Sequence, residues 1–96
     1  MDEFESELWS PDATDPWVFA TLPPDLSDDI RAVSGPPRGF GSVRVEVTLG
    51  TTTWRTSVFP DAKSGCFVLP VKKAVRLAED VEVGEIARIG LQVIDG

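Results

Sequence analysis

Thr21-Leu22-Pro23 stands directly before an amphipathic helical pattern, and Val68-Leu69-Pro70 stands before a second one 47 positions later. Each motif follows a strand pattern and a turn-rich loop, and each helical pattern is followed by a further apolar run. Two strand-strand-helix-strand units predict one domain, residues 1–96, with similar halves at about 3–50 and 52–95. Six strands in so short a chain leave little to cover sheet edges, which favours closing the sheet into a barrel.

The fold class is therefore mainly β, a six-stranded barrel with a short helix at each end. The expected strands cover about 4–9, 17–22, 42–49, 53–59, 66–69 and 86–94, and the expected helices cover about 24–34 and 71–79. Proline suits the start of each helix because its missing N–H would have no partner in the first turn. Apolar residues at helical spacing predict core-facing stripes. These are Leu26, Ile30 and Val33 in the first helix, and Val71, Ala74, Val75 and Ala78 in the second.

The central hairpin is the clearest element, because residues 42–49 alternate between polar and apolar side chains. A two-residue turn at the glycine that follows would place Glu46 opposite Arg55 and Arg44 opposite Ser57.

Composition excludes several classes of protein. The chain has no histidine, no tyrosine and a single cysteine, which removes the commonest metal ligand, the standard catalytic triad and a thiolate zinc site. No apolar run approaches the roughly 20 residues that a membrane helix needs. The acidic start lacks the basic region of a secretory signal, and one cysteine fits a reducing compartment. We therefore expect a cytoplasmic protein with no membrane association, no metal and no cofactor.

The net charge of −7 is unevenly distributed. Residues 1–30 carry nine acids and no base, whereas residues 38–76 carry seven bases and two acids. Residues 77–96 return to a net charge of −4. Two interpretations follow: acidic and basic stretches neutralise each other across the folded sheet, as on mixed protein surfaces, or a basic site is set in an acidic shell.

The second predicted helix begins with the wrong sign of charge. Lys72 and Lys73 lie at its first turn, where the helix dipole is already positive, and Arg76 follows one turn later. One interpretation is ion pairing with acids of the first strand, such as Glu5 or Glu7. The other is an anion site, in which the lysines join the free N–H groups of the helix start.

A second basic group lies on the polar face of the central hairpin. If this face is solvent-exposed, Arg44 and Arg55 only aid solubility, and Glu46–Arg55 is a weak cross-strand pair. If the face lines a cleft, the two guanidinium groups and Ser57 could bind a carboxylate or phosphate. Trp54 continues the apolar face and is expected in the core.

The other aromatic and reactive side chains surround loops. Trp9 and Trp17 flank the first loop and are candidates for an aromatic lip over a pocket, as is Phe40 between two glycines. Lys63 lies close before Cys66 in the second loop, but Cys66 begins an apolar strand, so a buried and inert thiol is favoured over a reactive one.

Three blocks of sequence are specific in wording and order. They are Gly39-Phe40-Gly41-Ser42-Val43-Arg44-Val45, Thr53-Trp54-Arg55-Thr56-Ser57-Val58-Phe59-Pro60-Asp61 and Leu69-Pro70-Val71-Lys72-Lys73-Ala74-Val75-Arg76. Through them the chain, over about residues 4–95, resembles a bacterial domain-of-unknown-function family, the one numbered nineteen-oh-five. The resemblance implies a double-split β-barrel, the architecture also used by swapped-hairpin transition-state regulators. In many bacteria this domain is linked to a bacteriocin-protection (YdeI/OmpD-associated) domain. The resemblance implies no activity.

A binding or interaction module is the favoured function, because the residue types bind ligands better than they transform them. The expected ligand is an anionic small molecule or an acidic protein partner, with a homodimer seam as one location for the site. The candidate residues are Arg44, Arg55, Ser57, Lys63, Lys72, Lys73, Arg76 and Trp54.

Two alternatives belong to other classes. A cofactor-free enzyme of isomerase, lyase or cyclase type would fold its substrate by binding alone, with acid-base help from Asp61, Lys63, Glu46 or Ser57. It would need an enclosed pocket of roughly 300 Å3 or more that holds a carboxylate or lysine with a displaced pKa. A nucleic-acid-binding regulator rests on fold analogy and is opposed by the net charge of −7. No catalytic residue is assigned.

Overall fold

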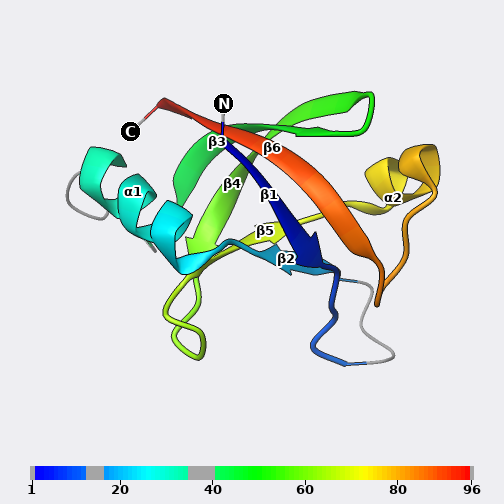
Figure 1. Ribbon diagram of the computed structural model, residues 1–96, viewed down its shortest axis with the longest axis horizontal. Coiled ribbons are helices and arrows are strands. Elements are labelled where there is room, and N and C mark those ends of the chain that lie inside the picture. Colours follow the sequence, from blue (N-terminus) through cyan, green and yellow to red (C-terminus); the bar gives the residue numbers. More distant parts are fainter. Residues whose placement is uncertain (1, 13–16, 35–40, 96) are drawn as a thin grey trace.

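The computed structural model describes residues 2–12, 17–34 and 41–95, and within these residues the fold is a nearly closed six-stranded barrel with two helices (Figure 1). The elements in chain order are β1 (Asp2–Glu7), β2 (Phe19–Thr21), α1 (Pro24–Ser34), β3 (Val43–Leu49), β4 (Thr52–Pro60), β5 (Phe67–Pro70), α2 (Lys73–Glu79) and β6 (Ile86–Asp95). The mainly β class and the order of elements predicted from the sequence are confirmed.

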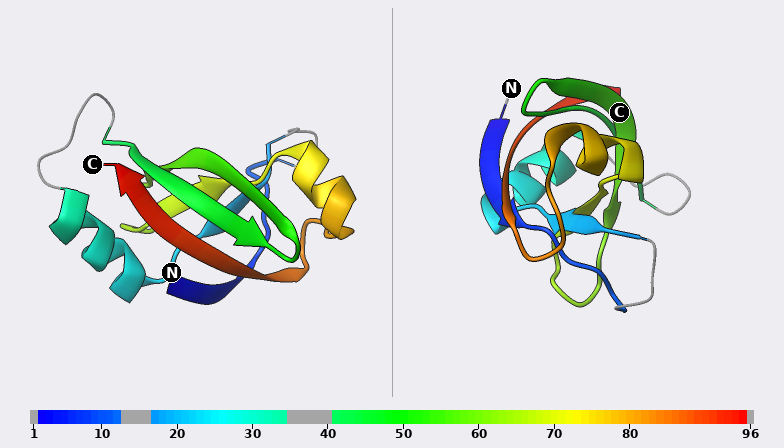
Figure 2. Two further views of the ribbon diagram at one scale, coloured as in Figure 1. Left: turned by 90° about the horizontal axis from the view of Figure 1, so that it is seen from above. Right: turned by 90° about the vertical axis from the view of Figure 1, so that its right-hand side faces the viewer.

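One sheet runs in the order β1-β6-β3-β4-β5-β2 and curls so that its two outer strands meet. Trp9, just after β1, exchanges two backbone hydrogen bonds of 2.9 and 2.8 Å with Phe19 on β2. The bridge brings together the two strands that would otherwise be free edges, as a barrel requires. Figure 2 shows α1 and α2 at opposite ends of the barrel.

The central hairpin has the predicted register. Glu46 lies opposite Arg55 and Arg44 lies opposite Ser57, as a two-residue turn requires. Side chains therefore alternate as expected, and Val45 and Val47 are fully buried. Among the described residues, nineteen buried apolar side chains from the eight elements and the connections between them form one core.

The two helices contact this core unequally, and three of their residues that were predicted to be buried are exposed. In α1, Leu26 and Ile30 are buried, but Val33 is 70% exposed because the helix contacts the barrel through its first two turns. The second helix starts two residues later than predicted, so Val71 is buried in the connection before it. Only Val75 of α2 is buried, and Ala74 and Ala78 are exposed, because this seven-residue helix lies across the barrel end with one narrow side inward.

Polar side chains attach each helix to the sheet. In α1, the hydroxyl of Ser27 is fully buried and accepts the backbone N–H of Phe67 at 3.0 Å. At the other end, the carboxylate of Glu79 accepts the hydroxyl of Thr52 at 2.5 Å and the N–H of Thr51 at 3.3 Å. Glycine suits position 50, because its φ is +62° and a Cβ there would displace the carboxylate of Glu79, whose Oε1 would lie 1.8 Å away.

Candidate functional site

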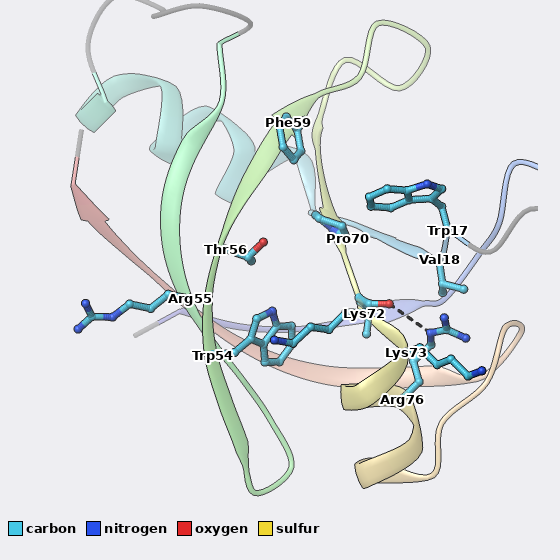
Figure 3. A pocket seen from close by; sticks show the side chains of 11 residues that line it. Trp17, Val18, Trp54, Arg55, Thr56, Phe59, Pro70, Lys72, Lys73 and Arg76 are labelled. Atoms are coloured by element: carbon cyan, nitrogen blue, oxygen red, sulfur yellow. Dashed lines mark hydrogen bonds between the residues drawn. The ribbon is translucent and has the colours of Figure 1, made fainter.

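The barrel is split between β4 and β5. The two strands pair only at Phe59–Val68 and Pro60–Phe67, although β4 continues back to Thr52 and β5 runs on to Pro70. From this short contact the strands diverge, because β5 leads into α2 while β4 follows β3 along the hairpin. A cleft of about 670 Å3 lies in the split, at the end of the barrel that α2 covers (Figure 3).

The body of the cleft is apolar and partly aromatic. Trp54 and Thr56 come from the inner face of β4, where alternation places them opposite Val47 and Val45. Trp54 is half-buried and packs against the edge of the core, which agrees in part with its predicted core position. The remaining apolar side chains of the lining are Trp17, Val18, Phe59, Pro70 and Val71.

The start of α2 supplies the cations. Lys72 is the N-cap residue, with extended backbone angles and no side-chain cap, and no acid lies in the first turn of the helix. Lys72 and Lys73 are exposed at the rim of the cleft. Arg76, one turn later, donates from Nε to the carbonyl oxygen of Val71 at 3.2 Å, so its head is held at the same rim (Figure 3).

The predicted neutralisation of these lysines by the first strand is not observed. Glu5 and Glu7 lie on β1, in register with Arg88 and Ile86 of β6. Across the residues that the structure describes, no carboxylate comes within 4.0 Å of either lysine ammonium group. The charges of Lys72 and Lys73 are therefore not compensated by a neighbouring acid in the described part of the chain.

Arg55 belongs to the lining, but its guanidinium group points away from the cleft (Figure 3). Its Nε lies 3.4 Å from Oε2 of Glu46, the cross-strand pair that the register predicts. Both side chains contact solvent, so this ion pair contributes under about 1 kcal/mol.

Three of the predicted site residues lie outside the lining. Arg44 and Ser57 face each other on the outer side of the β3–β4 hairpin, away from the cleft. Lys63 is exposed in the β4–β5 loop. The structure therefore brings Trp54, Lys72, Lys73 and Arg76 together at the cleft and separates Arg44, Ser57 and Lys63 from them. Arg55 lines the cleft, but its charged group lies outside it.

Among the described residues, two carboxyl groups have displaced pKa values, and both lie in contacts with turns outside the cleft. The Ser64 hydroxyl donates to Asp61 at 3.0 Å, and this bond is the main cause of a lowered Asp61 pKa. The hydroxyl of Thr52 has the same effect on the pKa of Glu79. The Glu79 contact could not be predicted from local sequence patterns, since it joins a helix end to a hairpin residue 27 positions away.

The two tryptophans that flank the first loop, Trp9 and Trp17, lie in different surroundings. Trp17 is 59% exposed, lines the cleft and stacks on Phe19 with ring centroids 6.1 Å apart. Trp9 instead donates its indole N–H to the Thr21 hydroxyl at 2.8 Å and does not line the cleft. Phe40 lies outside the described residues.

A second, shallower hollow of about 410 Å3 adjoins the cleft. Trp17 and Phe59 line both, and Pro11, Phe19 and Val68 complete the second. Phe59 was not among the predicted site residues. Alternation along β4 places it on the same outer face as Arg55, which indicated that its side chain would not lie in the core. Cys66 is buried, as predicted.

Neither a membrane span nor a metal cluster is found in the described residues. No helix among them is long and apolar enough to cross a membrane. Within the same ranges, no three Cys, Asp or Glu side chains gather as metal ligands would.

Comparison with known proteins identifies a family and no activity. Residues 4–91 match the family described as "Domain of unknown function (DUF1905)". No curated protein matches the chain.

Proposed function

Because the chain belongs to the DUF1905 family, whose description names no activity, we propose from the cleft itself that the protein is a binding module for an anionic ligand with an apolar body. We also interpret the two β-β-α-β segments as an internal repeat. The proposed setting is the bacterial cytoplasm, which the single unpaired cysteine supports.

One observation supports this function most strongly. A cleft of about 670 Å3 combines aromatic and aliphatic walls with Lys72, Lys73 and Arg76 at one rim, and none of the described residues that line it carries a carboxylate. Apolar walls favour an aromatic or aliphatic body, and a few convergent polar groups fix its orientation. Lys72 and Lys73, which have no acid nearby among the described residues, favour a carboxylate or phosphate on that body.

The test is thermal unfolding in the presence of aromatic carboxylates and phosphates, each paired with its neutral amide or alcohol. A ligand at one hundred times its Kd stabilises the folded state by about 2.7 kcal/mol. For a domain of this size, each kcal/mol raises the Tm by about 4–8 °C. We expect the anions to raise the Tm and the neutral partners to have little effect.

Charge reversal locates the site. The double variant Lys72→Glu with Lys73→Glu should weaken anion binding at least about tenfold, because like charges then meet the ligand. Lys63→Glu is the control for charge reversal at a distance, since this lysine is also exposed but lies outside the cleft. Equal stabilisation of both variants by the anions, or no stabilisation of the wild type at millimolar concentration, would contradict the proposal.

The alternatives gain no support from the site. The groups expected to assist catalysis, Asp61, Lys63, Glu46 and Ser57, all lie outside the lining of the cleft. Because no carboxylate occurs among the described residues of that lining, general acid-base chemistry is less well supported than binding. Nucleic-acid binding stays a third prediction, opposed by the net charge of −7.

A further inference from the structure

The side of β4 that faces the split is an open strand edge. On its other side, β3 pairs with every residue of β4 from Thr52 to Val58. On the split side, β5 pairs only with Phe59 and Pro60. Within the described part of the chain, no other strand occupies this side of β4.

The hydrogen-bonding groups along this edge can be assigned from the alternation of the strand. Successive residues of an antiparallel strand direct their N–H and C=O groups to opposite neighbours. Asp61, directly after β4, donates its N–H across the β4–β5 side to the carbonyl of Cys66 at 2.9 Å. Odd positions therefore face β5, and the N–H and C=O groups of Arg55 and Ser57 point into the split.

The facing edge of β5 is nearly empty of such groups. Val71 donates its N–H to Val18 on the β2 side at 2.8 Å, so the preceding residue, Pro70, faces the split. Proline has no N–H, and it therefore offers one carbonyl and no donor. An extended chain entering the split would find a complete hydrogen-bonding edge on β4 only.

The surroundings select the chemistry of such a chain. Because the cleft and the adjoining hollow share Trp17 and Phe59, they form a continuous apolar path from the outer face of β4–β5 toward α2. Alternate side chains of an extended peptide could occupy pockets along this path, as in other cases of strand addition. The path ends at Lys72 and Lys73, which favour acidic side chains or a terminal carboxylate.

We infer that the ligand of this cleft is an extended acidic peptide that adds to the open edge of β4 at Arg55 and Ser57, with its acidic end at Lys72 and Lys73. This inference rests on the proposed function, since it uses the same cleft and cations. It differs in requiring backbone hydrogen bonds, which a small anion does not need.

The first experiment compares two synthetic heptapeptide libraries by fluorescence polarisation against the full chain. One library alternates apolar and glutamate residues, and the other carries lysine in place of glutamate. We expect the acidic library to bind at least about tenfold more tightly, because like charges repel the basic one. Binding of small aromatic carboxylates without binding of either library overturns the inference and leaves the proposed function standing.

The second experiment tests the backbone pairing with the tightest acidic peptide. Methylating its amide nitrogens at odd positions in one version and at even positions in another removes the donors from one side at a time. We expect only one version to lose binding, by at least about tenfold. Equal loss or equal retention overturns the pairing with β4.

A matched pair of protein variants places the pairing on β4. Arg55→Ala and Arg55→Pro both remove the guanidinium group, but only proline also removes the N–H that faces the split. The β3 side needs no N–H at this position, so the barrel should tolerate proline, which circular dichroism checks. Peptide binding should be at least about tenfold weaker in Arg55→Pro than in Arg55→Ala, and equal affinities overturn the inference.

A second copy of this chain is the remaining occupant, and sedimentation velocity over a range of concentrations separates it. Concentration-dependent dimers that the acidic peptide does not dissociate overturn the inference. A monomer that binds the peptide supports it. If neither peptides nor small anions bind, the proposed function itself fails.

Discussion

The gap between β1 and β2 and the split between β4 and β5 have the same position in the two β-β-α-β segments, but different side chains lie in them. On the β1–β2 side, Ser6 donates its hydroxyl to the carbonyl of Thr21 at 3.0 Å, and Trp9 donates its indole N–H to the Thr21 hydroxyl. On the β4–β5 side, no such side-chain bridge joins the described strands, and the cleft opens instead. The difference indicates that side chains, rather than the order of strands, decide which of the two gaps stays open.

The two helices differ in the same sense. The first has 11 residues, an acid in its first turn, and buries Leu26, Ser27 and Ile30 against the barrel. The second has seven residues, a lysine start and one buried side chain, Val75. One end of the molecule therefore has the charge pattern that favours helix stability, and the other has the pattern that favours an anionic ligand.

The largest expected change in stability is for a substitution in α1, the better-packed helix. Ile30→Ala in α1 should lower the free energy of unfolding by about 2–5 kcal/mol, because it removes a fully buried side chain and leaves a cavity. Leu77→Ala in α2 is the control, since Leu77 is 72% exposed and should change stability by no more than about 0.5 kcal/mol. Urea unfolding of both variants measures the difference, and equal losses would contradict the unequal packing described for the two helices.

A smaller effect is expected for the side-chain hydrogen bond between Trp9 and Thr21, which joins β1 to β2. Trp9→Phe removes the indole donor and Thr21→Val removes its acceptor, and the double variant completes a cycle. The coupling should be about 1 kcal/mol in favour of the wild-type pair, the usual size of a net hydrogen bond. A coupling indistinguishable from zero in urea unfolding would mean that this contact does not hold β1 and β2 together.

Much of the fold follows from local patterns in the sequence. The register of the central hairpin was predictable because a two-residue turn fixes the pairing, and alternation then assigns each side chain to one face. Val33, Ala74 and Ala78 were misplaced because a helical stripe shows which side is apolar but not how much of the helix meets the core.

The positive charges of the candidate site were predictable from the sequence, and its apolar walls were predictable only in part. Lys72, Lys73 and Arg76 lie close together in sequence on one helix start, so their clustering needed no tertiary information. Arg44 and Ser57 were included because the outer face of the hairpin could not be told from a cleft without knowing where the barrel splits. Trp17 was expected beside a pocket from its place at the end of the first loop, but the contribution of Phe59 depends on that split, which no local pattern encodes.

The smallest effect concerns the contact that holds α2 against the hairpin. The Thr52 hydroxyl holds the pKa of Glu79 below its ordinary value of 4.5 in the folded protein. The ionised carboxylate therefore contributes stability in full above that ordinary value, and this contribution is lost as the pH falls through the lower folded-state value. Glu79→Gln removes the titrating group, so the variant should lose less stability than the wild type between about pH 5 and about pH 3.

Urea unfolding at a series of pH values measures this, with Glu5→Gln on the exposed face of β1 as the control. The stability difference between wild type and Glu79→Gln should shrink as the pH falls, whereas Asp61 titrates in both proteins and cancels. A difference that stays constant over this range would show that Glu79 does not hold the hairpin through its charge. The cleft would then depend on the apolar contacts of Val71 and Val75 to position the lysines of α2.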